Sequence, residues 1–118
     1  ELQMGPIESR FADIIWTNEP ISSSELAKKS EAELTWKKTT SYTVLKRLCG
    51  KGIFVNNRGT VTSLISREQF YSMQSAQYVE ETFDGSLPAF IAAFTKQKKL
   101  SSKEIAEIQK MIEEAEEK

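Results

Sequence analysis

The sequence predicts a mainly α-helical protein with one small β hairpin, in the order three helices, hairpin, three further helices. Capping boxes, in which a serine is followed three residues later by Glu or Gln, mark helix starts at Ser22, Ser66 and Ser101. Two β-prone runs flank the turn-forming segment Asn56-Asn57-Arg58-Gly59. We therefore expect two domains, which comprise residues 5–66 and residues 67–118.

The first two helices are indicated by apolar spacing and by a capping box. The first helix carries apolar residues at helical intervals, namely Ile7, Phe11, Ile14 and Ile15. It should end near Trp16, because Pro20 disfavours helical backbone in the residue before it. The second helix should run from Ser22 to about Ser30.

The third helix is expected to begin at Thr35, an acceptable N-cap, and to end where Gly50 and Gly52 permit a reversal of the chain. Its inward stripe should consist of Ser41, Val44, Leu45 and Leu48. The other faces of this helix then carry hydroxyl, aromatic and basic side chains.

The remaining elements follow from turn and cap signals. Residues 53–55 and 60–65 should pair as the hairpin, and a fourth helix should run from Arg67 to about Phe83. The segment Asp84-Gly85-Ser86 stops that helix and caps the fifth. A sixth helix, capped by Ser101 and Glu104, should present Ile105, Ile108, Ile112 and Ala115 on one face.

Acidic residues are absent between Glu33 and Glu68, although the chain as a whole has a net charge of −1. Seven basic residues lie inside this window: Lys37, Lys38, Lys46, Arg47, Lys51, Arg58 and Arg67. A helix and hairpin without carboxylates suit a polyanionic partner. Residues 1–66 carry a formal charge of +2 and residues 67–118 of −3. A chance imbalance explains these totals equally well, so the prediction depends on the window.

The composition argues against an enzyme. Histidine is absent and Cys49 is the only cysteine, which excludes an internal disulfide and a thiolate metal cluster. The commonest general base is therefore missing, and the chain has no glycine-rich phosphate loop. We expect no catalytic residues, no metal and no cofactor. Without a signal peptide or an apolar run of about 18 residues, the sequence predicts a cytoplasmic protein that does not insert into membranes.

Three helices followed by a hairpin form the layout of a winged helix-turn-helix domain, whose third helix can lie in the major groove of double-stranded DNA. The candidate DNA contacts are Lys37, Lys38, Thr39, Thr40, Tyr42, Thr43, Lys46, Arg47 and Arg58. Their hydroxyls can bond phosphates or base edges, and their cationic groups suit phosphates. For Arg47 taken singly, helix packing and solvation are an equally good explanation. For Arg58, the role of an ordinary exposed turn residue is equally good.

Three further side chains have two interpretations each. Trp16 and Trp36 could act as stacking platforms, but packing in the core is favoured because tryptophans near helix ends bury well. Cys49 would be a redox switch if a neighbouring cation stabilised an exposed thiolate. A partly buried, inert thiol is the favoured interpretation.

Large apolar residues are dense in the last three helices. The set comprises Phe83, Leu87, Phe90, Ile91, Phe94, Ile105, Ile108, Met111 and Ile112. Three short helices bury such a set poorly on their own, so we expect it to form a homodimer interface. A self-contained core shared with the winged domain is the alternative.

Spacing in the third helix resembles that of the penicillinase and methicillin-resistance repressor family. The family pattern W-x-x-x-T-x-x-T-x-x-x-R-L-x-x-K-G corresponds here to Trp36, Thr40, Thr43, Arg47, Leu48, Lys51 and Gly52. Trp16 closes the first helix, as in the family. The similarity continues through residues 83–87 and from Phe94 to Ile105, and so covers nearly the whole chain.

The resemblance implies a homodimeric transcriptional repressor that binds an inverted-repeat operator and dimerises through its C-terminal helices. In the drug-responsive branch a membrane-sensor-linked protease leads to cleavage of an Asn-Phe bond. The matching pair here is Ala93-Phe94, so induced cleavage at this bond is a hypothesis. The paired C-x-C motifs of the copper branch are absent. The family's usual Ser-Pro-Lys is Lys37-Lys38-Thr39 here, and Tyr42 replaces its common arginine, so the operator should differ.

We therefore expect a dimeric repressor that reads a palindromic operator, on the pattern of a β-lactam-resistance operon. The alternative is a winged helix that serves as a protein-interaction module, with its basic face docked on an acidic partner.

Overall fold

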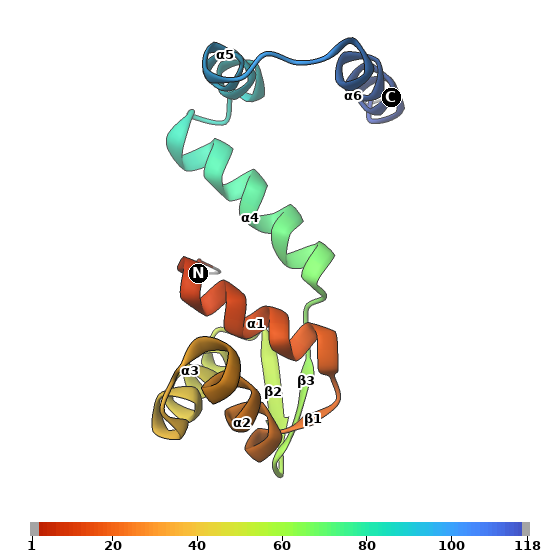
Figure 1. The fold of residues 1–118 in the computed structure, drawn as a ribbon. Helices are drawn as coiled ribbons and strands as arrows, with labels where there is room; N and C mark the ends of the chain where they lie inside the picture. Colours follow the sequence, from red (N-terminus) through yellow and green to blue (C-terminus); the bar gives the residue numbers. More distant parts are fainter. Residues whose placement is uncertain (1–2, 117–118) are drawn as a thin grey trace. The chain divides into compact units, whose positions relative to one another are not determined.

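The computed structural model describes residues 3–116 and contains the helices in the predicted order, together with a small antiparallel sheet (Figure 1). The elements are α1 (Pro6–Asn18), β1 (Ile21–Ser22), α2 (Ser23–Leu34), α3 (Lys38–Gly50), β2 (Phe54–Asn57), β3 (Thr60–Ser63), α4 (Arg67–Thr82), α5 (Leu87–Gln97) and α6 (Ser102–Glu114). The predicted fold class, mainly α with a small β component in a winged helix-turn-helix arrangement, is confirmed.

The sheet has the strand order β1-β3-β2, with both pairs antiparallel. Strand β1 pairs through Ile21 with Val61 of β3. The sequence did not predict β1, because two residues are too few to show the alternation by which a strand is recognised. The carboxylate of Glu19 secures this corner, since it accepts hydrogen bonds from the backbone N–H and the hydroxyl of Ser63, each at 2.8 Å.

The core lies where the first three helices meet the sheet. Its fully buried side chains include Phe11, Ile15, Leu26, Leu48, Ile53, Phe54, Val61 and Phe70. The stripe predicted for α3 is buried as expected, because Ser41, Val44, Leu45 and Leu48 all face this core. The orientation of α3 is therefore fixed by its place in a core that also contains residues of α1, α2, α4 and both hairpin strands.

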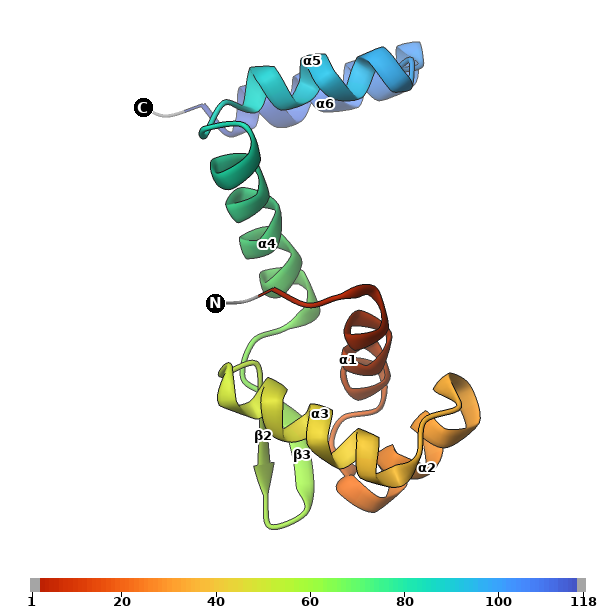
Figure 2. The same cartoon turned by 90° about the vertical axis from the view of Figure 1, so that its left-hand side faces the viewer.

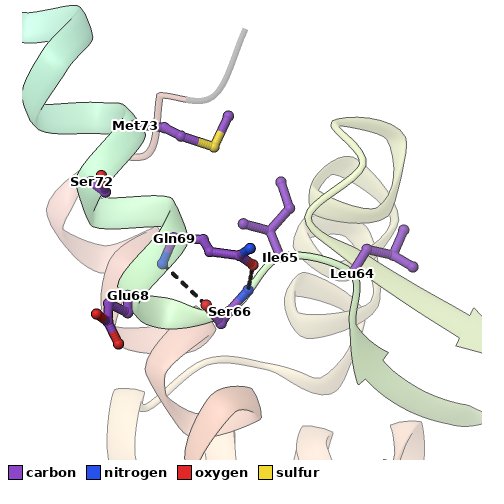
Figure 3. A pocket seen from close by; sticks show the side chains of 7 residues that line it. All are labelled: Leu64, Ile65, Ser66, Glu68, Gln69, Ser72 and Met73. Atoms are coloured by element: carbon purple, nitrogen blue, oxygen red, sulfur yellow. Dashed lines mark hydrogen bonds between the residues drawn. The ribbon is translucent and has the colours of Figure 1, made fainter. Parts of the chain in front are cut away.

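The capping serines begin helices as predicted. The Ser22 hydroxyl accepts the Glu25 N–H at 3.1 Å, but the return bond from the Ser22 N–H to the Glu25 side chain is not formed within residues 3–116, so only half of this predicted capping box is present. At the start of α4, Ser66 and Gln69 exchange two hydrogen bonds, each of 3.1 Å, beside an open hollow bordered by Leu64 and Met73 (Figure 3). The third box, at Ser101 and Glu104, is also complete.

Helix α2 is longer than predicted, and this moves the start of α3. It continues past Ser30 to Leu34, because Leu34 is buried and the Ser30 hydroxyl donates within the helix to the Leu26 carbonyl at 2.8 Å. Thr35 then ends α2 in the left-handed region, at φ 58°. The expectation that Thr35 caps α3 is thus wrong. Lys37 is the N-cap, without a side-chain hydrogen bond to the helix.

Residue contacts divide the chain into two compact units, one that ends at Gln77 and one that begins at Tyr78. The division lies within α4, beyond the boundary expected after residue 66. The first turn of α4 belongs with the winged unit, because Phe70 is fully buried and its ring centroid lies 5.7 Å from that of Trp16. The second unit contains the end of α4 and the helices α5 and α6.

Candidate nucleic-acid interface

Helix α3 has a buried face and an exposed face, and the exposed face carries most of the predicted DNA contacts. Opposite its buried stripe, helical geometry places Thr39, Thr43 and Lys46, with Tyr42 on one flank and Arg47 on the other. Every candidate from Lys37 to Arg47, and Arg58 as well, has an exposed side chain. Figure 2 shows this helix running beside the β2–β3 hairpin, to which residues 51–53 connect it directly.

The hydroxyl of Thr43 is already engaged within α3. It donates a hydrogen bond to the Thr39 carbonyl at 2.9 Å. The oxygen of Thr43 keeps lone pairs that can accept a hydrogen bond, such as one from the exocyclic amine of cytosine or adenine. Tyr42, 44% exposed, retains both donor and acceptor capacity on its hydroxyl. We call the exposed residues from Thr39 to Thr43 the reading face, because they are the predicted contacts to bases. This face offers an acceptor at Thr43 and, beside it, the aromatic ring of Tyr42 with its polar tip.

Arg47 is held by an acidic residue of α1. Its Nη1 lies 3.0 Å from Oε2 of Glu8. Glu8 also accepts the Gly5 N–H at 3.3 Å, which fixes its carboxylate at the start of α1. This arrangement supplies the packing role that was one of the two interpretations of Arg47. One N–H of the guanidinium is used by Glu8, and the half-exposed group has further donors that can meet a phosphate.

Sequence reasoning missed Glu8 as a part of this surface, and it left the neighbouring Lys51 out of the candidate DNA contacts. Lys51 donates through Nζ to the Gln3 carbonyl at 2.6 Å and adds positive charge beside Glu8. Partial burial raises the pKa of Glu8, but the Gly5 hydrogen bond, the Arg47 guanidinium and the Lys51 charge together outweigh that effect. The net pKa lies below the ordinary value of 4.5. The spacing of Gly5 and Glu8 resembles a capping box and was the available signal.

Acid should remove the stabilisation that Glu8 provides. Because the folded state lowers the pKa of Glu8, its contribution is fully present above the unfolded-state pKa and is lost as pH falls through the folded-state value. We expect the free energy of unfolding of wild type to decline below about pH 4.5 by more than that of a Glu8→Gln variant. Urea unfolding across this pH range measures the difference, and parallel declines would contradict the prediction.

The wing is the hairpin formed by β2 and β3, and at its tip Arg58 has a backbone conformation that arginine rarely adopts. Arg58 and Gly59 have φ values of 54° and 89°, as a two-residue type I′ hairpin turn requires. The Asn56 side chain accepts the Gly59 N–H at 2.9 Å. The strain of a left-handed residue arises because its Cβ crowds the following carbonyl oxygen, so Gly at position 58 would relieve it and Asn would tolerate it better. A strained, exposed arginine at the hairpin tip favours a binding role over an ordinary turn residue.

The remaining basic residues of the acid-free window divide into paired and unpaired groups. Arg67 forms an ion pair with Asp13 and hydrogen-bonds the Thr17 hydroxyl at 2.9 Å. Among residues 3–116, no carboxylate forms an ion pair with the lysines or the arginine that remain available, which are Lys37, Lys38, Lys46 and Arg58. Lys37 and Lys38 lie at the start of α3, and Lys46 lies three residues beyond Thr43 on the same helix. Arg58 lies at the tip of the β2–β3 hairpin.

The tryptophans and the cysteine follow the favoured interpretations. Trp36 stacks on Phe11 with ring centroids 5.1 Å apart, and the Trp16 indole donates to the Ile65 carbonyl at 3.0 Å. Both pack against the core. Burial raises the pKa of the half-buried Cys49 thiol, and a hydrogen bond with the Asn56 backbone offsets this only partly. The thiol form is therefore favoured at neutral pH, which argues against a redox switch.

Ser41 is a polar group without a partner under the reading face. Its hydroxyl is buried and has no hydrogen bond within the described part of the chain. A Ser41→Ala variant should gain about 1 kcal/mol in free energy of unfolding, because an unsatisfied buried hydroxyl is removed. Ser30→Ala is the matched control, since the buried Ser30 hydroxyl is bonded and its removal should bring no gain. Chemical denaturation of both variants provides the test, and a loss at Ser41 would contradict it.

The predicted dimer residues are exposed or only half-buried in the second unit. Among the described residues after Phe70, none has a buried side chain. Leu87, Phe94 and Met111 are 53%, 44% and 62% exposed. Phe90 is the centre of an aromatic cluster, with its ring centroid 5.6 Å from Phe83 and 6.2 Å from Phe94. The bond between Ala93 and Phe94 lies inside α5 and is exposed as well.

Other kinds of site find no support in the described residues. Between residues 3 and 116 there is no group of three or more Cys, Asp or Glu residues that could hold a metal ion. In the same part of the chain, none of the helices combines the length and the apolar character needed to cross a membrane.

Comparison with known proteins agrees with this geometry. Residues 4–114 match the penicillinase repressor family model. The chain is also 27% identical, over 116 residues, to the penicillinase repressor of Bacillus licheniformis, an alignment that covers 95% of this chain and 91% of that protein. The family is one of regulators and not of enzymes. A family model that matches almost the whole chain, a winged helix-turn-helix fold and an exposed acid-free α3 lead to one conclusion: the chain belongs to the penicillinase repressor family and is a DNA-binding transcriptional repressor.

Proposed function

We propose that the chain acts as a homodimer that represses transcription by binding an inverted-repeat operator, with one α3 helix and one wing in each half-site. The observation that carries this proposal is the exposed face of α3, which combines Thr39, Tyr42 and Thr43 with unpaired lysines and no carboxylate. Hydroxyl and aromatic groups can distinguish base edges, whereas the lysines bind phosphates of any sequence.

The unburied C-terminal apolar set supports the homodimer. Helix-turn-helix proteins usually engage two half-sites one helical turn of DNA apart, or a multiple of it, and two linked readers multiply the affinity of each. A second copy would cover the exposed side chains of α5 and α6, which are otherwise in contact with water.

Selection of duplexes from random sequence by the wild-type protein tests the proposal. An inverted repeat should emerge, and its affinity should fall steeply as salt rises, because phosphate contacts release counterions. The same duplex with scrambled half-sites is the control. A selection that yields no preferred sequence, or binding to an acidic protein but not to duplex DNA, would favour the protein-interaction alternative.

We further propose that induction proceeds by proteolysis in α5, in an operon of the β-lactam-resistance type. The bond in question is Ala93-Phe94, which is exposed but helical. The Thr95 hydroxyl donates to the Ile91 carbonyl at 2.9 Å across this turn, so the helix must open before a protease can bind an extended substrate. Mass spectrometry of the protein after induction in cells should find fragments that end at Ala93. Intact protein after induction would contradict this route and leave the repressor proposal unaffected.

A further inference from the structure

A second acid-free segment lies in the C-terminal unit, where the overall charge is negative. No Asp or Glu occurs between Asp84 and Glu104. This segment ends in a cluster of four lysines within eight residues, Lys96, Lys98, Lys99 and Lys103, which we call the 96–103 cluster. All four side chains are exposed, and none forms an ion pair with a carboxylate among residues 3–116.

Helix stability accounts for only part of this cluster. Lys96 lies in the last turn of α5, where a cation complements the helix dipole. Lys98 and Lys99 lie in the α5–α6 connection, where extended backbone at Lys98 ends α5. Lys103 lies in the first turn of α6, where a positive charge opposes the dipole. Favourable interaction with a helix dipole therefore accounts for only one of the four lysines.

We propose that the 96–103 cluster is a second DNA contact, which binds backbone phosphates outside the groove read by α3. The inference rests on the proposed function, because the winged unit of the same polypeptide brings the DNA close and raises its effective concentration. Lysine ammonium groups bind phosphates as point charges without reading sequence. In a dimer the cluster occurs twice, so it adds affinity that is strongly salt-dependent and independent of base sequence.

An anionic membrane surface is the competing partner, and the distribution of charge disfavours it. Helices that lie on membranes carry basic residues along their whole polar face. In α5 the residues between the apolar positions are mostly alanine, and the lysines are gathered at one end. A compact group of charges at a helix end and the adjoining connection suits a few neighbouring phosphates.

The test compares the DNA affinity of wild type with that of a variant in which all four lysines are changed to Gln. The duplex is one selected by the wild-type protein, and it is long enough to extend beyond both half-sites. The variant should bind roughly tenfold more weakly at low salt, by the same factor on the selected and the scrambled duplex. The salt dependence of its affinity should be shallower by about 0.9 in log–log slope for each phosphate that the variant no longer neutralises. As a single substitution, Lys99→Gln should weaken binding and Lys110→Gln should not, because Lys110 is also exposed but lies among the carboxylates of α6.

An unchanged salt slope in the four-lysine variant would overturn the inference, as would lysine-dependent binding of phosphatidylserine vesicles without any change in DNA binding. A merely structural role of the lysines would not alter the salt slope. Circular dichroism and sedimentation of the variant are the controls for its fold and its oligomeric state. Failure of the proposed function is distinct, because wild type itself would then select no duplex.

Discussion

A Phe94→Asp variant should be a folded monomer whose affinity for the inverted-repeat operator is lower by about a hundredfold or more, since two linked half-sites multiply affinity by that order. Phe94 is 44% exposed in the absence of a partner and belongs to the aromatic cluster around Phe90. A carboxylate at this position could not be buried in an apolar interface without a large desolvation cost. Because the winged unit has its own core, its fold should persist.

Sedimentation and operator titration measure the two effects together. Ala92→Asp is the matched control, because it introduces the same charge on α5 at an exposed position roughly opposite the face of Phe94. That variant should remain dimeric. A dimeric Phe94→Asp protein with wild-type operator affinity would place the subunit interface elsewhere.

On α3, Tyr42→Ala and Thr43→Ala should each weaken binding to the selected operator by about tenfold to a hundredfold, the range expected when one interaction with a base edge is removed. Binding to scrambled DNA should hardly change if these side chains contact base edges and not phosphates, as we propose. Lys38→Ala should instead weaken both complexes alike and reduce the magnitude of the salt slope by about 1. The contrast depends on the positions of these residues, since Thr43 lies opposite the buried stripe and Lys38 in the first turn of α3.

Titration of the selected and scrambled duplexes at several salt concentrations separates the two classes. Lys28→Ala, at an exposed site on α2, is the control for the loss of a surface lysine. If Thr43→Ala and Lys38→Ala gave the same uniform loss, the reading face would have to be reassigned.

Local signals in the sequence were sufficient for most of the fold. The capping residues Ser22, Ser66 and Ser101 each begin a helix as predicted, because a cap involves residues only three apart. Thr35 shows the limit of such signals. A threonine before a helix is compatible with capping, but burial of Leu34 extended α2 and left Thr35 to end that helix instead.

The exposed face of α3 could be located from helical spacing, whereas the interactions of each side chain on it could not. The sequence left Arg47 equally divided between DNA contact and packing. The ion pair that decides its surroundings joins it to Glu8, 39 residues earlier in the chain. Lys51 is similarly tied to Gln3. Such partners come together only when α1 and α3 pack, so no periodicity within α3 could reveal them.

The sequence by itself determined the order of the helices and the hairpin, the buried stripe of α3 and the absence of acid from its exposed face. These properties depend on neighbours within one or two turns, so they can be read before the chain folds. Tertiary structure alone decided that β1 completes the sheet, that Lys37 caps α3, and that Glu8 holds Arg47. These features depend on contacts between residues distant in sequence, which exist only once the core has formed.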